Sequence, residues 1–417
     1  MNINRDNYLN QLIAGRHNGL IKVITGIRRC GKSYLLFELF HNYLISSGID
    51  ENHIIELALD DRSNIEYRDP DALLKYIKAH IIDKEEYIIL LDEIQLVPEF
   101  TDVLNSTLHI RNCDVYVTGS NSHFLSSDIV TEFRGRSQEI QMYPLSFSEY
   151  LQGCPGDKYS AWKDYYTYGG LPHILNMHTD KMKEDYLYNL FKSVYMIDIL
   201  ERHIIKNKYE FEEIIKVVAS SVGSLCNSTK LSNTFKSVKQ ISIHHNTINK
   251  YLSYLQDAFV IEKATKYDIK GKKYINSLVK YYFSDIGIRN CILGFRQQDE
   301  SHIMENIIYN ELKIRGYRVD VGYIETRVSD KTGKLIRKQL EVDFVVNQGS
   351  KRYYIQSALQ IPNPEKEKQE SASLLKIEDY FKRIIIVKDD IKPKRNDAGI
   401  LTIGIMDFLL NPNSLDI

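Results

Sequence analysis

The stretch Leu20–Phe40 reads LIKVITGIRRCGKSYLLFELF and decides the fold of the first part of the chain. An apolar run at residues 20–24 comes first, the pattern G-x-x-x-x-G-K-S follows at residues 26–33, and apolar residues at helical spacing come after it. This order of strand, glycine-containing loop and helix is the context in which the pattern binds phosphate. A glycine turn with a chance lysine is the competing interpretation.

The residue types of this loop suit a nucleoside triphosphate. Gly26 and Gly31 allow the backbone to curl, so that N–H groups and the positive end of the next helix converge on phosphate oxygens. Lys32 is expected to reach the β- and γ-phosphates of ATP, and the Ser33 hydroxyl to bind Mg²⁺. The predicted nucleotide-binding set is Gly26, Ile27, Arg28, Arg29, Cys30, Gly31, Lys32, Ser33 and Tyr34.

A second motif, Tyr87–Gln95, is an apolar run that ends in two acidic residues. It reads as a buried parallel strand that delivers Asp92 and Glu93 at its carboxyl end, where α/β sheets bind ligands. Asp92 is expected to hold Mg²⁺, directly or through water, and Glu93 to polarise the attacking water. A strand with a solvated acidic turn is the alternative, but the phosphate loop independently requires such a pair.

Two further features are candidates for the same site. The strand 114–118 ends in small polar residues, among which Asn121 could hydrogen-bond the γ-phosphate or the lytic water, or only cap a helix. Arg134 and Arg136 lie in a loop-like segment, and either could act as an arginine finger, often supplied by a neighbouring subunit. Surface arginines are usually only solvated, so both interpretations stay open.

Composition restricts the class of protein. The chain has 417 residues, 43% hydrophobic and 26% charged, with a net charge of -1, so we expect about three globular domains and no global affinity for nucleic acid. The opening residues have no apolar segment of a signal peptide, and no run approaches the length of a membrane span. Five scattered cysteines indicate a reducing cytoplasm and no cysteine-rich metal site.

Residues 228–290 differ from the rest in charge, with eleven Lys or Arg and four acids. A short helix near 236–241, a turn at 244–247, an amphipathic helix after it and a hairpin with a lysine-rich tip predict a winged helix-turn-helix. We expect it to bind double-stranded DNA, and a module used only for packing or oligomerisation is the alternative. The predicted DNA contacts are Lys250, Lys270, Lys272 and Lys273.

The region after about residue 302 reads α–β–β–β–α–β, the layout of PD-(D/E)XK metal-dependent nucleases. Glu305 and Asp343 are the expected acids of such a site, which needs a second strand carboxylate and a lysine to orient hydroxide. Gln356 and Ala358 stand at those two positions, and a neutral amide binds Mg²⁺ poorly. The site is predicted to be degenerate unless Lys351 or Lys366 replaces the lysine.

Taken together, the motifs resemble those of the prokaryotic AAA+-type ATP-binding proteins with an N-terminal AAA module and a C-terminal domain of unknown function numbered 4143. The resemblance covers nearly the whole chain and implies an Mg²⁺-ATP site, a winged helix and a nuclease-like tail. Its carriers are GIRRCGKS at 26–33, LLDEIQ at 90–95, TGSNS at 118–122, GR at 135–136, PLSFSEY at 144–150, YGGLP at 168–172 and EVDFVV at 341–346.

The sequence therefore predicts an α/β protein in four segments: a P-loop ATPase domain of the AAA+ type with a parallel sheet (1–150), a helical connection (151–227), a winged helix-turn-helix (228–295) and a degenerate nuclease-like α/β domain (296–417). The predicted function is an Mg²⁺-dependent ATPase, a homo-oligomer, whose nucleotide state controls DNA binding. One alternative is a regulatory switch that engages a protein partner. The other is an ATP-gated nuclease.

Overall fold

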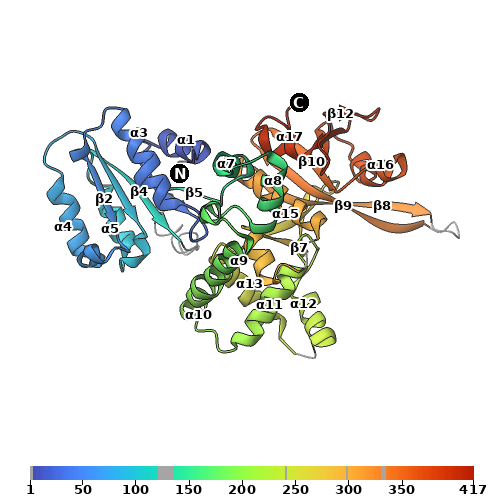
Figure 1. The fold of residues 1–417 in the computed structure, drawn as a ribbon, viewed down its shortest axis with the longest axis horizontal. Helices are drawn as coiled ribbons and strands as arrows, with labels where there is room; N and C mark the ends of the chain where they lie inside the picture. Colours follow the sequence, from blue (N-terminus) through green and yellow to red (C-terminus); the bar gives the residue numbers. More distant parts are fainter. Residues whose placement is uncertain (1–2, 121–132, 134, 240–241, 297–298, 330–334) are drawn as a thin grey trace. The chain divides into compact units, whose positions relative to one another are not determined.

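The computed structural model of the protein describes residues 3–120, 133, 135–239, 242–296, 299–329 and 335–417 (Figure 1). The chain forms two compact units, each with its own β-sheet. The first unit comprises Met1–Pro144, Leu171–His173 and Asp257–Phe259, and the second comprises Leu145–Gly170, Ile174–Gln256 and Val260–Ile417. The four-segment division stays a prediction, and each unit is described by itself.

The first unit is built on a five-stranded parallel sheet with the strand order β2-β3-β4-β1-β5. The motif strands β1 and β3 are not neighbours, because β4 lies between them. All parallel strands present their carboxyl ends at one edge, so the loops that follow β1, β3 and β4 meet there. The strands are β1 (Ile21–Thr25), β2 (Ile54–Ala58), β3 (Tyr87–Asp92), β4 (Cys113–Gly119) and β5 (Ser137–Gln141).

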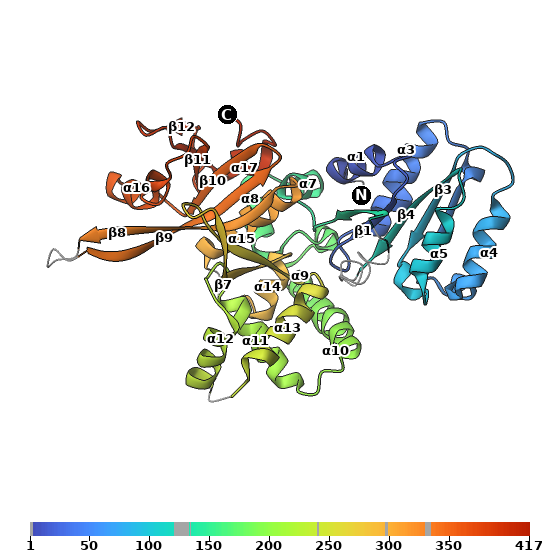
Figure 2. The same cartoon turned by 180° about the vertical axis from the view of Figure 1, so that it is seen from behind.

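Helices cover both faces of this sheet (Figure 2). The loop after β1 leads into one continuous helix, α2 (Lys32–Tyr34), a π-helical turn (Leu35–Phe40) and α3 (His41–Ser46), which packs beside α1 (Asp6–Ala14). On the other face, α4 (Pro70–His80) packs against α5 (Phe100–Thr107). The core of this face is aliphatic, as expected for strands buried between helices, and includes Val23, Leu57, Leu73, Ile89, Leu104 and Val117.

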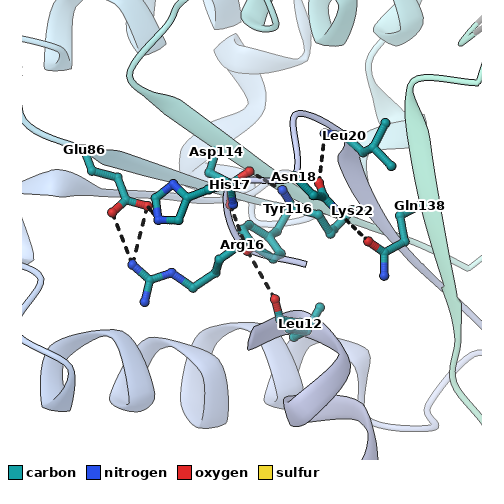
Figure 3. A network of polar contacts seen from close by, with 10 residues as sticks. All are labelled: Leu12, Arg16, His17, Asn18, Leu20, Lys22, Glu86, Asp114, Tyr116 and Gln138. Atoms are coloured by element: carbon teal, nitrogen blue, oxygen red, sulfur yellow. Dashed lines mark hydrogen bonds and ion pairs between the residues drawn. The ribbon is translucent and has the colours of Figure 1, made fainter. Parts of the chain in front are cut away.

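A buried polar network lies at the amino-terminal edge of this sheet, away from the phosphate loop (Figure 3). Lys22 on β1 is fully buried, its ammonium contacts the carboxylate of Asp114, and it lies 4.5 Å from the ring centre of Tyr116. Burial lowers the pKa of Lys22, and the hydrogen bond to Asp114 opposes that shift. Arg16 contacts Glu86 at 3.2 Å nearby, so the loop after α1 is anchored by charge as well as by packing.

The second unit contains an eight-stranded mixed sheet with the order β12-β13-β11-β10-β9-β8-β6-β7. The hairpin β6–β7 joins it through a parallel pairing of β6 with β8, so one sheet spans the predicted boundary between residues 295 and 296. Its strands are β6 (Ile261–Asp268), β7 (Lys273–Phe283), β8 (Arg318–Ser329), β9 (Leu335–Gln348), β10 (Lys351–Ala358), β11 (Lys382–Val387), β12 (Lys394–Arg395) and β13 (Leu401–Gly404).

Helices fill the remainder of this unit. A capping box begins α7, with the Ser146 hydroxyl accepting from the Glu149 N–H and the Glu149 carboxylate accepting from the Ser146 N–H. No helix among the described residues is both long and apolar enough to cross a membrane. The helices are α7 (Phe147–Gly153), α8 (Lys158–Tyr168), α9 (Asp180–Leu190), α10 (Ile197–His203), α11 (Lys208–Ser220), α12 (Ser228–Thr234), α13 (His245–Asp257), α14 (Ile286–Ile292), α15 (Glu300–Ile314), α16 (Pro364–Ser371) and α17 (Ile405–Leu410).

Candidate functional site

The loop after β1 has the backbone geometry of a phosphate cradle. Gly26 and Gly31 have φ angles of 142° and 103°, which residues with a Cβ rarely adopt. A Cβ on Gly26 would lie 2.1 Å from the carbonyl oxygen of Met142, so this position also requires the absence of a side chain. The Lys32 ammonium folds back over the loop and donates to the carbonyls of Gly26 at 3.0 Å and Ile27 at 3.3 Å. A phosphate in the cradle would offer this ammonium anionic acceptors in place of neutral carbonyls.

Asp92 at the end of β3 lies next to the phosphate loop. Its Oδ2 accepts a hydrogen bond from Ser33 Oγ at 2.7 Å, and its Oδ1 accepts one from the Thr118 hydroxyl. Asp92 is 3% exposed, and burial raises its pKa, an effect that a bound cation would oppose. A hydroxyl and a carboxylate in contact form a donor set of hard oxygens that fits Mg²⁺, so Ser33 and Asp92 are the residues that would hold it.

Glu93, the predicted base, is held by residues that end β4. Its backbone is in the left-handed region at φ 53°, which turns the chain sharply after β3, and its N–H donates to Thr118 Oγ1 at 3.0 Å. Glu93 Oε2 accepts from Ser120 Oγ at 3.0 Å and from the side-chain amide of Gln95. Because β4 pairs with β3, Thr118 and Ser120 at the end of β4 contact Asp92 and Glu93.

The hydrogen bonds around Glu93 involve side chains that the sequence analysis did not assign to the site. Asn121 was the predicted polar sensor, but it lies outside the described residues. Thr118, Ser120 and Gln95 make the hydrogen bonds to Glu93 instead. The signal was present in the sequence, since small polar residues follow β4 and Gln95 follows the acidic pair, but spacing alone could not show which side chains converge.

Arg136 lies at the opposite edge of the same sheet. Its carbonyl accepts from the N–H of Ile21, and β5 pairs with β1 from Ile21–Ser137 to Thr25–Gln141. Gln141 pairs with Thr25, so five residue steps of about 3.3 Å each separate Arg136 from the start of the phosphate loop along the strand. The exposed Arg136 side chain thus cannot reach the phosphate loop of its own chain. Arg134 lies outside the described residues.

In the second unit, the predicted nuclease-like acids surround a buried lysine that was not foreseen as part of this site. The Lys280 ammonium on β7 lies 2.8 Å from Glu305 on α15, 2.6 Å from Glu341 and 3.6 Å from Asp343, both on β9. The Lys280 side chain is 2% exposed. The Tyr282 hydroxyl adds a 2.6 Å hydrogen bond to Glu305. We call Lys280, Glu305, Glu341 and Asp343 the lysine-carboxylate cluster.

The other positions around this cluster do not supply what a nuclease needs. The Gln356 amide oxygen is buried and has no hydrogen-bond partner among the described residues, and Ala358 is buried. The two lysines considered as replacements are paired with other carboxylates, Lys351 with Asp416 at 2.7 Å and Lys366 with Glu370 at 2.6 Å. Within the described part of the chain, the one cation in contact with Glu305 and Asp343 is Lys280.

The basic segment 228–290 exposes less positive charge than its composition suggests. Three of its eleven basic side chains are buried within the part that the structure describes. Lys266 is 5% exposed and lies 4.0 Å from the ring centre of Tyr323, Lys280 is in the cluster, and Arg289 is 1% exposed and donates to the Ala219 carbonyl at 2.9 Å. Of the predicted DNA contacts, Lys250, Lys272 and Lys273 are exposed, and Lys270 is paired with Glu378 at 2.7 Å.

The parallel sheet, the glycine loop and the acidic strand end together define a P-loop unit of the AAA class. In agreement, residues 18–151 match the family described as an AAA domain, and residues 159–299 match a domain of unknown function numbered 8612. A protein of Haemophilus influenzae, described as uncharacterized, is 34% identical over 414 residues, 98% of each chain. The chain belongs to the same family of AAA-domain proteins.

More distant similar proteins do not extend the family assignment. A Methanocaldococcus jannaschii protein, also described as uncharacterized, is 26% identical over 407 residues, 93% of this chain and 85% of its own length. The Orc1 protein of Aeropyrum pernix in complex with DNA is 10% identical over 70% of this chain and 93% of that chain, with a TM-score of 0.32, too low to support an inference. The match to domain 8612 covers the predicted helical connection and winged helix, and the predicted domain 4143 stays a prediction.

Proposed function

We propose that the protein is an Mg²⁺-dependent ATPase. The observation that carries the proposal is the convergence of Lys32, Ser33, Asp92 and Glu93 at the carboxyl edge of the sheet, with Ser33 and Asp92 in hydrogen-bond contact. In this arrangement Lys32 and the loop N–H groups bind the phosphates, and Ser33 and Asp92 hold the cation. Glu93, oriented by Ser120 and Gln95, accepts the proton of the attacking water.

We further propose that the nucleotide state controls the binding of double-stranded DNA. The order α11, α12, α13 and hairpin β6–β7, with a single bridge between Cys226 and Val279, supports a winged helix-turn-helix. Lys250 on α13 and the lysines at the hairpin tip are exposed, which supports their assignment as phosphate contacts. The direct test is the ATPase rate with and without duplex and single-stranded DNA, and stimulation by duplex is the expected result.

A regulatory switch that engages a protein partner is the second candidate. The observation that favours it is the burial of Lys266, Lys280 and Arg289. These three cations are therefore missing from the surface of segment 228–290 that would contact DNA. If the protein hydrolyses ATP and its ATPase rate is unchanged by duplex or single-stranded DNA, this candidate is favoured over the first.

The tail is proposed to be a nuclease-like domain that does not cut. A Mg²⁺ ion between Glu305 and Asp343 would have to displace the buried Lys280 ammonium, and neither Gln356 nor Ala358 supplies the missing carboxylate or lysine. We therefore expect no cleavage of DNA with Mg²⁺ or Mn²⁺. Cleavage that disappears in Asp343→Ala would contradict this proposal and favour an ATP-gated nuclease.

Changing Lys270, Lys272 and Lys273 together to alanine should weaken duplex binding for all sequences alike, since phosphate contacts carry no sequence information. The salt dependence should flatten by up to about 0.9 per lost contact in the log–log slope, and less for Lys270, which Glu378 already neutralises. Lys75, Lys78 and Lys84 are exposed on the other unit, and their triple alanine variant is the charge-matched control. Equal duplex affinity in the two variants would count against the hairpin as a DNA contact.

We propose that Arg136 acts on the phosphate loop of a neighbouring subunit, because it cannot reach the loop of its own chain. Arg136→Ala should lower the turnover number by about a hundredfold and leave the nucleotide Kd unchanged, because the arginine is expected to stabilise only the transition state. Lys32→Ala subunits keep Arg136, and Arg136→Ala subunits keep the phosphate loop. Mixing the two inactive proteins should therefore restore activity, measured against total protein concentration. A mixture that stays inactive, although the subunits associate, would exclude a finger in trans.

A further inference from the structure

Arg5, at the start of α1, is one of the largest fully buried side chains of the first unit. Its exposed fraction is 2%, and its guanidinium reaches across to two separate segments. Nη1 donates to the carbonyl of Cys30 at 3.1 Å, and Nη2 donates to the carbonyl of Tyr143 at 2.7 Å and to that of Pro144 at 3.4 Å. One arginine therefore joins the phosphate loop to the chain that leaves β5.

The contact with Cys30 acts on the peptide group that the phosphates would use. The carbonyl of Cys30 and the N–H of Gly31 belong to one peptide unit, and Gly31 immediately precedes Lys32 in the predicted cradle. A cation bonded to the carbonyl polarises this unit and makes its N–H a stronger donor. Arg5 would thus strengthen phosphate binding without touching the nucleotide.

The second segment, residues 142–144, also packs directly behind the loop. The Met142 carbonyl lies against Gly26 and accepts from the Cys30 thiol at 3.7 Å. The Tyr143 N–H donates to the Tyr8 hydroxyl at 3.0 Å, and the Arg5 guanidinium lies 4.8 Å from the centre of the Tyr8 ring. Pro144 is the last residue of this segment before the chain enters the second unit at Leu145.

We propose that Arg5 is a positioning residue of the nucleotide site that also couples the phosphate loop to the exit segment 142–144. This inference rests on the proposed ATP site. Phosphates bound to the 30–31 peptide would hold it in place, and the hydrogen bonds of Arg5 would then also restrain residues 143 and 144. Nucleotide binding therefore reduces the motion of the segment where the chain leaves the first unit.

The test compares Arg5→Met and Arg5→Lys with the wild type. The Kd of a fluorescent ATP analogue should rise up to about tenfold in Arg5→Met, because the 30–31 peptide loses the cation that polarises it, and less in Arg5→Lys, which keeps the charge. KM should rise more than the turnover number falls. Nucleotide should slow hydrogen exchange of residues 142–150 in the wild type but not in Arg5→Met. Arg16→Met removes an arginine from the loop after α1 at the other edge, and should leave all three readouts unchanged.

The experiment distinguishes a failure of the proposed ATP site from a failure of the proposed role of Arg5. A wild type that binds no nucleotide would overturn the proposed ATP site. A wild type that binds, with Arg5→Met showing the same Kd and the same exchange protection, would overturn the role of Arg5 alone. Should Arg5→Met not fold, Arg5→Lys and Tyr8→Phe decide the question. Tyr8→Phe removes the acceptor of the Tyr143 N–H and should reduce the nucleotide-dependent protection, whereas unchanged protection in both variants would refute the coupling.

Discussion

Lys32→Ala is expected to abolish nucleotide binding. Lys32 is 5% exposed, its ammonium lies over the phosphate loop, and its present acceptors are two neutral loop carbonyls. A triphosphate would replace them with anionic oxygens, so the lysine is expected to contribute more in the bound state than in the free one. Titration with a fluorescent ATP analogue should show no saturable binding, and circular dichroism should show that the variant remains folded.

Glu93→Gln is expected to bind ATP normally and to lower turnover by about 10²–10⁴-fold. An amide keeps the shape of the carboxylate and can still contact Ser120, but it cannot accept a proton from water. The measurement is the steady-state ATPase rate beside the nucleotide Kd of the same preparation. Glu99→Gln, an exposed acid six residues further on, is the control and should match the wild type. Hydrolysis by Glu93→Gln at the parental rate would show that another group is the base.

Local sequence was sufficient to predict the elements of the nucleotide site. The strand before Gly26, the helix from Lys32 and the acids at the end of β3 each follow from a contiguous stretch, because periodicity and glycine geometry are local properties. The Asp198–Arg202 pair on α10 and the capping box at Ser146 are local in the same sense, since each joins residues three or four positions apart. Helix limits were less accurate: the helix expected near 236–241 begins at Ser228.

What the sequence could not supply were contacts between distant segments. Arg5 and Cys30 are 25 residues apart, and Lys280 and Asp343 are 63 apart, so no spacing rule relates them. Composition was misleading for Lys280, because a lysine in a basic segment is normally assigned to the surface. Around Lys280 carboxylates replace the lost water, and which carboxylates do so depends on the fold that brings β7, α15 and β9 together.

The lysine-carboxylate cluster has a titration behaviour of its own. Burial and the neighbouring Glu305 raise the pKa of Asp343 to about 7, well above that of an aspartate in an unfolded chain. The folded protein therefore holds an extra proton between about pH 4 and pH 7. Its stability contribution is present at low pH and is lost as the pH rises through about 7.

Lys280→Met should destabilise the second unit by about 3–5 kcal/mol, since it leaves the buried Glu305 and Asp343 and the partly exposed Glu341 without their shared cation. Asp343 of the variant loses the neighbouring ammonium that lowers its pKa, so the pKa of Asp343 rises further and folding takes up more protons. The loss should accordingly be larger at pH 8 than at pH 5, as measured by urea unfolding at both pH values.

Lys263→Met removes an exposed lysine of the same hairpin and should change little. In the double variant Lys280→Met/Glu305→Gln, part of the stability should return, because one of the unpaired charges is gone. A Lys280→Met protein that unfolds like the wild type at pH 8, or that loses the same stability at both pH values, would mean that the ammonium does not neutralise this cluster.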